Sequence, residues 1–317
     1  MQEEKNVTPE IKSAKTEIKI ATKIADFIGE TNLKAQKTDM DYILIHRETV
    51  QPNGAVMLFH GLTGSPYELK KYAKFLYSIG FDVYCYCLPG HGSHDIDIYN
   101  VKEKDWRTFA ANTYRELRPK YADFFVGGLC LGAVLALNLA EENKDITGLI
   151  CLSTTLFLDG WTIPWYNFLM PLGLHTILRY YYTFPEREPF GIKNEKVRNT
   201  ISKLMQKNTV AMDNYPLSSI YELLKLSKKV RQNIKKVFAP VLIIHSLEDD
   251  LTSTKSAKFT YKNVSSFYKE YMELKDSYHL ILYDNEKEKV YNKTTEFINA
   301  LSYKRNITLK ELQNKKR

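Results

Sequence analysis

The chain has 317 residues, of which 44% are hydrophobic and 26% are charged. This composition is that of an ordinary globular protein, and it excludes a chain that is disordered throughout. The net charge of +8 is concentrated in residues 225–239 and 304–317, but no nucleic-acid-binding motif accompanies it. We therefore expect solvated basic surfaces and no nucleic-acid partner.

Residues 1–40 precede the first strand signal and are predicted to form an N-terminal extension, with apolar residues at helical spacing between 11 and 28. The first five residues are polar and acidic, which is unlike the start of a signal peptide. We find no apolar run of the roughly 18 residues that a membrane-spanning helix needs. On these grounds we expect a cytoplasmic protein.

From residue 41 onward, apolar β-favouring runs alternate with stretches of helical periodicity. The predicted strands are 41–46, 55–59, 81–88, 122–126, 146–153, 241–245 and 271–274. The predicted helices are 65–79, 102–117, 133–142, 255–261 and 286–301. Such alternation predicts an α/β fold with a mostly parallel sheet that is covered by helices on both faces.

The alternation is interrupted once, by a segment rich in aromatic residues that is predicted to be mostly helical. We assign 41–154 and 237–303 to the α/β core, 155–236 to a cap (lid) inserted over the carboxyl edge of the sheet, and 304–317 to a basic C-terminal tail.

The motif Gly128-Leu129-Cys130-Leu131-Gly132 lies between a buried strand and an apolar helix. A sharp strand-to-helix turn leaves little room beside its central residue, so glycines are needed two positions before and two after it. The side chain of Cys130 would then sit at a helix N-terminus, where the helix dipole favours a thiolate or an oxyanion. A buried structural cysteine in a glycine-rich turn is the alternative.

A nucleophile needs a base, and the base needs an acid that orients it. Two later strands lead into loops that contain Asp249 and His279, and the chain order Cys130, Asp249, His279 is that of α/β nucleophile-elbow enzymes. We therefore predict a Cys-His-Asp triad. Asp250 and Glu248 remain alternatives for the acid.

Other groups complete or compete with this predicted site. The backbone N–H groups of Leu62 and Leu131 are predicted to form an oxyanion hole, because fixed amides stabilise a developing oxyanion well. His60 and His91 lie in glycine-containing loops, and we expect both to hydrogen-bond to the backbone. We predict neither a metal site nor a cofactor.

With these motifs in place, residues 40–301 resemble the α/β-hydrolase superfamily, and specifically its branch of small carboxylesterases and monoacylglycerol lipases. The resemblance rests on residues 60–64, 88–92 and 277–279, on the turn around Cys130 and on the acid segment 245–257. It implies the hydrolase fold, a helical cap at 155–236, acyl ester substrates and no metal or organic cofactor.

One departure from the family concerns the nucleophile, which is usually Ser and here is Cys130. A thiolate leaves the tetrahedral intermediate of an oxygen ester more readily than an alkoxide does, so the intermediate tends to revert to substrate. The sequence therefore predicts an acyl ester or thioester hydrolase. An acyltransferase on the same triad is the first alternative, and a non-catalytic member that binds an acyl ligand or a partner is the second.

Aromatic residues of the predicted cap suggest where the acyl chain binds. The candidate lining residues are Trp161, Trp165, Tyr166 and Phe168. The same residues would equally serve to pack the cap onto the core. We expect a small-molecule substrate, with lipid-surface contact through the basic stretch 225–236 as a further possibility, and we make no prediction of the oligomeric state.

Overall fold

The computed structural model describes residues 41–47, 51–91, 98–164, 174–205 and 214–314. The predicted N-terminal extension at 1–40 lies outside this range. Within the described part of the chain, no helix is long and apolar enough to cross a membrane.

The centre of the molecule is a seven-stranded sheet in the order β1-β3-β2-β4-β5-β8-β9. Its strands are β1 (Tyr42–Leu44), β2 (Gly54–Phe59), β3 (Phe81–Cys85), β4 (Phe124–Leu129), β5 (Gly148–Leu152), β8 (Val241–Ser246) and β9 (Lys269–Leu274). Among the described strands of this sheet, β1 alone pairs in the antiparallel sense. The predicted α/β class is therefore confirmed.

The two faces of the sheet follow from the alternation of side chains along each strand. On β2, Met57 and Phe59 belong to one hydrophobic cluster, whereas Val56 and Leu58 belong to the other. Both sets are apolar because helices cover both faces, which explains why the central strands read as continuous apolar runs.

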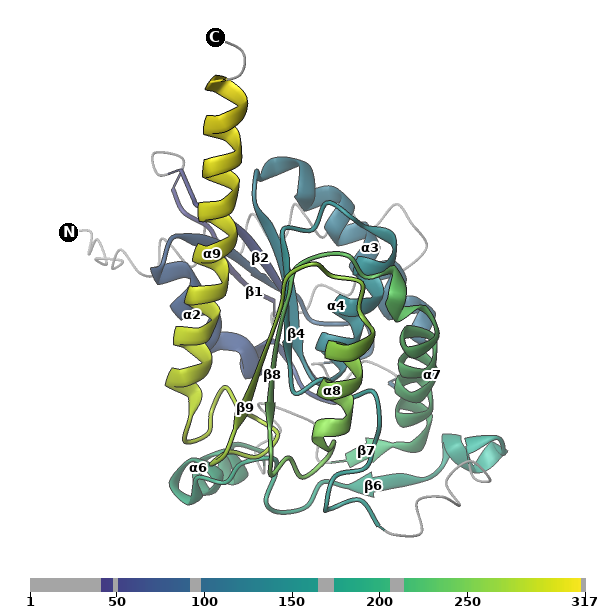
Figure 1. The fold of residues 1–317 in the computed structure, drawn as a ribbon. Coiled ribbons are helices and arrows are strands. Elements are labelled where there is room, and N and C mark those ends of the chain that lie inside the picture. Colours follow the sequence, from purple (N-terminus) through teal and green to yellow (C-terminus); the bar gives the residue numbers. More distant parts are fainter. Residues whose placement is uncertain (1–40, 48–50, 92–97, 165–173, 206–213, 315–317) are drawn as a thin grey trace, which may run out of the picture.

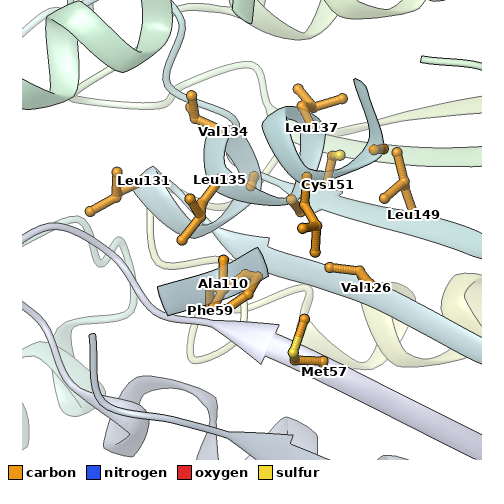
Figure 2. Packing of buried hydrophobic residues seen from close by; sticks show 14 of the residues in the cluster. Met57, Phe59, Ala110, Val126, Leu131, Val134, Leu135, Leu137, Leu149 and Cys151 are labelled. Carbon is orange, nitrogen blue, oxygen red and sulfur yellow. The ribbon is translucent and has the colours of Figure 1, made fainter. Parts of the chain in front are cut away.

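The first cluster packs under α3 (Glu103–Leu117), α4 (Leu131–Glu142) and α8 (Thr254–Asn263). The second packs under α2 (Lys70–Ser78) and α9 (Lys287–Asn314). Figure 1 shows this three-layer arrangement, and Figure 2 shows residues of the first cluster filling the space between α4 and the strands. Short 3-10 turns η1 (Pro66–Leu69), η2 (Arg118–Lys120) and η5 (Ile234–Lys236) adjoin α2, α3 and α7 (Leu217–Asn233).

Helix α9 is longer than the predicted range 286–301, because it continues to Asn314 through most of the predicted tail. The prediction ended the helix where its apolar stripe ends at Leu301. In Figure 1 the final turns of α9 extend past the rest of the molecule.

The segment inserted between β5 and β8 is less helical than predicted. Its described elements are η4 (Ile177–Tyr180), β6 (Thr183–Pro185), α6 (Glu195–Met205), β7 (Asn214–Pro216) and α7 (Leu217–Asn233). Strands β6 and β7 form a small antiparallel sheet of three pairs. Such short strands carry little periodic signal, and their partners are far apart in sequence, so the sequence analysis missed this sheet.

Candidate active site

Cys130 occupies the turn between β4 and α4, with φ 57° and ψ −115°. A positive φ is strained for a residue other than glycine, so the surrounding packing must enforce it. The turn lies so close to the end of β2 that no side chain fits at either flanking glycine. A Cβ at Gly132 would lie 1.9 Å from the carbonyl oxygen of Phe59, and one at Gly128 would lie 2.5 Å from the same oxygen. The side chain of Cys130 is 8% exposed. This is the sharp turn that the glycine spacing predicts.

The loops after β8 and β9 bring Asp249 and His279 together. His279 Nδ1 lies 2.8 Å from Asp249 Oδ2 and 3.0 Å from Oδ1, and both residues are buried. Asp250 instead accepts a 3.3 Å hydrogen bond from the backbone N–H of His279. The side chain of Glu248 forms an ion pair with Lys193. Of the three acids considered from the sequence, Asp249 is thus the one on the imidazole ring.

The pKa values of His279 and Asp249 are shifted in opposite directions. Burial disfavours the imidazolium, but the charges of Asp249 and Cys130 outweigh it and hold the pKa of His279 well above its usual range. Burial likewise opposes ionisation of Asp249, yet His279 keeps the pKa of that carboxyl lowered. His279 Nε2 is buried, and none of the described groups meets hydrogen-bond geometry with it. The ring is therefore fixed on one side and open for proton transfer on the other.

The two candidate oxyanion donors lie on segments that flank Cys130. Leu131 is the first residue of α4, where an amide N–H has no acceptor within the helix. Leu62 is in the loop after β2, which turns tightly through a hydrogen bond from Gly64 N to Gly61 O. Thr63 in the same loop has φ 61°. Both backbone segments are buried and fixed before any substrate binds.

Glu68 is a residue near the site whose contact the sequence analysis did not anticipate. It lies in η1, and its Oε2 accepts a 2.9 Å hydrogen bond from Gly61 N. A Cβ at Gly61 would stand 3.2 Å from this oxygen and 3.5 Å from Cys130 Cβ, so the carboxyl and Cys130 border the same space. Burial raises the pKa of Glu68 to about 7. The signal available in the sequence was an acid just beyond a glycine-rich loop.

The remaining histidines considered are held by backbone groups. His60 Nε2 accepts from Leu88 N–H, so Nδ1 carries the proton that it donates to Gly61 O at 2.8 Å. His91 Nδ1 lies 3.1 Å from Pro89 O, and burial lowers its pKa to about 4. The expected backbone bonds of His60 and His91 are thus confirmed.

His245 is the penultimate residue of β8 and lies close to Asp249. Its Nε2 donates to Thr252 O at 2.9 Å and lies 3.6 Å from Asp249 Oδ2. Burial lowers the pKa of His245, which favours the neutral ring.

The inserted segment reaches both triad loops through Lys193. Its Nζ lies 2.9 Å from Glu248 Oε2, in the loop of Asp249, and 3.0 Å from Asp276 Oδ1, in the loop of His279. The backbone N–H of Leu280 also donates to Gly191 O at 2.7 Å. The insertion is therefore attached to the loops that carry Asp249 and His279.

Trp161 is 57% exposed, donates from Nε1 to Glu248 O at 3.0 Å and meets the ring of Tyr278 edge-on. It thus lies beside the triad loops. The other predicted pocket residues, Trp165, Tyr166 and Phe168, lie outside the described residues. Within the part of the chain that the structure describes, no group of three or more His, Cys, Asp or Glu side chains is placed to hold a metal ion.

The sheet order, the strained turn at Cys130 and the histidine-carboxylate pair at the strand ends together define an α/β-hydrolase. The model of the family described as serine aminopeptidase, S33, matches residues 50–287. The chain belongs to this family and is an enzyme of the α/β-hydrolase superfamily.

Similar proteins fall in the same superfamily. The thermostable monoacylglycerol lipase of Bacillus sp. (strain H-257) is 27% identical over 253 residues, covering 76% of this chain and 89% of the relative. The carboxylesterase of Bacillus subtilis (strain 168) is 24% identical over 250 residues, covering 78% and 94%.

Solved structures agree on the fold. One of the metagenome-derived lipolytic enzymes LipS and LipT superposes with a TM-score of 0.70 at 23% identity, covering 83% of this chain and 98% of that one. The monoacylglycerol lipase from Paleococcus ferrophilus gives 0.68 at 19% identity, covering 82% and 98%.

Proposed function

We propose that this hydrolase cleaves acyl ester or thioester bonds through a covalent acyl-enzyme formed on Cys130. The observation that carries the proposal is the orientation of His279: Asp249 binds its Nδ1, and its buried Nε2 is left without a hydrogen-bond partner among the described residues. The charge of Cys130 raises the pKa of His279, which supports assigning this open nitrogen to the thiol. Cys130, His279 and Asp249 are thereby proposed as the nucleophile, the base and the orienting acid.

The proposed reaction has two halves. His279 takes the thiol proton, Sγ of Cys130 then bonds as a thiolate to the acyl carbon, and the N–H groups of Leu62 and Leu131 bind the oxyanion. The intermediate collapses as the bond to the leaving group breaks, and His279 returns the proton to that group. Water then attacks the thioester with His279 as base, and collapse releases the acid and the thiol.

The names of the relatives support the acyl ester class, because they describe a monoacylglycerol lipase and a carboxylesterase. We assign the cap role to residues 155–236, whose described part is attached to both triad loops by Lys193. Trp161, Trp165, Tyr166 and Phe168 are proposed to contact the acyl chain.

Cysteine chemistry favours one further candidate, acyl transfer. An acyl group on Cys130 is a thioester, which reacts readily with amines, thiols and alcohols. If transfer is the natural reaction, product should divide in favour of an added alcohol or amine at the expense of the free acid. Hydrolysis that dominates at every acceptor concentration would exclude this candidate.

The decisive experiment is intact-mass spectrometry after exposure to a panel of acyl esters and thioesters, paired with turnover of a chromogenic acyl ester. We expect a mass increase of one acyl group on the wild-type chain and neither adduct nor turnover in Cys130→Ala. Cys87→Ala is the matched control, because Cys87 is 7% exposed and Cys130 8%. Undiminished turnover in Cys130→Ala would refute the assignment.

A further inference from the structure

A buried threonine contacts the proposed nucleophile. Oγ1 of Thr155 donates a 3.2 Å hydrogen bond to Sγ of Cys130. Thr155 follows β5, the strand next to β4 in the sheet, and it is only 2% exposed. The hydroxyl is therefore a buried donor directed at the atom that attacks the substrate.

The backbone around Thr155 is held in place from two sides. Ser227 of α7 donates from Oγ to Thr155 O at 2.9 Å. Oγ of Ser256 in α8 accepts from the N–H groups of Leu156 and Phe157 at 3.2 and 3.1 Å. A donor fixed in this way loses little freedom when it binds a charged partner, which is the condition for electrostatic preorganisation.

The hydroxyl has one proton and two acceptors at the same distance, because Ser153 O also lies 3.2 Å from Oγ1. A hydrogen bond to an ionised acceptor is roughly twice as strong as one to a neutral acceptor. The proton therefore goes to Sγ when Cys130 is a thiolate. It turns to the Ser153 carbonyl when the sulfur is acylated and neutral.

We propose that Thr155 is a further catalytic residue, which stabilises the thiolate of Cys130 and thereby biases the site toward thioesters over oxygen esters. This inference rests on the proposed function, since it takes Cys130 as the nucleophile. It deepens that function by naming the substrate class.

The bias follows from how the tetrahedral intermediate divides. Either Sγ of Cys130 leaves and substrate is restored, or the substrate's own group leaves and the acyl-enzyme forms. A hydrogen-bond donor on Sγ favours the first path. It slows formation of the acyl-enzyme most when the substrate's own leaving group is an alkoxide. With a thioester both leaving groups are thiolates, and the penalty largely disappears.

The test compares Thr155→Val, which keeps the shape and removes the hydroxyl, with Thr155→Ser, which keeps the hydroxyl. Each variant is assayed with an unactivated oxygen ester and a thioester of the same acyl chain. We expect Thr155→Val to raise the ratio of kcat/KM for the oxygen ester over that for the thioester by roughly three- to tenfold. Thr155→Ser should leave the ratio near the wild-type value.

The ratio separates this role from a structural one, because damage to the loop would lower both activities together. The rate of iodoacetamide alkylation of Cys130 gives an independent reading, and Thr155→Val should slow it while Thr155→Ser should not. An unchanged ratio and an unchanged alkylation rate in Thr155→Val would overturn the inference. If instead wild-type Cys130 forms no acyl adduct at all, the proposed function itself fails.

Discussion

The sheet core and the inserted segment are built in contrasting ways. In the core, buried strands end in short loops that hold Cys130, Asp249 and His279 by backbone geometry and buried hydrogen bonds. In the insertion, the stretch before α6 has short elements, η4 and β6, and exposed apolar side chains, with Tyr181 78% and Ile177 69% exposed. From this difference we propose that the core fixes the chemistry, whereas the insertion influences which substrates reach it.

The two regions nevertheless meet at defined points. Lys193 joins the insertion to the loops of Asp249 and His279, and Oγ of Ser256 in α8 accepts from the N–H groups of Leu156 and Phe157. If the division of labour is correct, changes in the core should alter catalysis on every substrate. Changes at the junctions should have small effects that depend on substrate or salt.

The largest effect is expected for Asp249→Asn. The amide cannot hold His279 in the tautomer that leaves Nε2 free as a base, so kcat should fall by about 10³- to 10⁴-fold on ester and thioester alike. Asp250→Asn is the matched control, because the carboxyl of Asp250 accepts from the backbone N–H of His279, whereas that of Asp249 contacts the ring. Steady-state kinetics on both variants check this, and equal losses would show that the acid has been misassigned.

An intermediate effect on stability is expected for Glu68→Gln. The raised pKa of Glu68, about 7, means that the folded state keeps a proton that the unfolded chain has already lost. The contribution of this group to stability is therefore present in acid and is lost as pH rises toward 7. Between pH 5 and pH 8, the wild type should lose about 1–3 kcal/mol more of its free energy of unfolding than the variant does.

Urea denaturation of both proteins across this pH range measures that difference. Glutamine keeps an oxygen that can accept from Gly61 N, so the two proteins should be of similar stability in acid. A constant difference at all pH values would contradict the assigned titration.

The smallest effect is expected for Lys193→Met. Because Lys193 and its acidic partners are partly exposed, their ion pairs are screened, and kcat/KM should fall by only ~2- to 3-fold at low salt. The difference should vanish on the order of 1 M salt. Lys262→Met, on an exposed part of α8, is the control. A loss comparable to that of Asp249→Asn would break the proposed separation between core and insertion.

Much of the core could be predicted from the sequence because its signals are local. Apolar strand runs, helical periodicity and the glycines around Cys130 each act within a few residues, and parallel topology then places Asp249 and His279 at one edge. The choice of Asp249 over Asp250 required the geometry of adjacent residues on one loop, which spacing alone left open.

Contacts between distant segments could not be predicted. The hydroxyl of Thr155 meets Cys130 across two neighbouring strands, and Lys193 meets acids 55 and 83 positions away. No periodic pattern in the sequence indicates which distant residues will be in contact. The pairing of β6 with β7 was missed for the same reason.

The close approach of Gly132 to the carbonyl of Phe59 has a consequence for how the enzyme tolerates change. Here the turn around Cys130 rests directly on the end of β2, from which the loop of Leu62 departs, with no side chain between the two backbones. The distance between these two backbones therefore does not depend on which side chains fill the surrounding core. Conservative repacking of Leu135 or Val126 should alter thermal tolerance and leave turnover intact, so this scaffold should accept many neutral core substitutions during laboratory evolution.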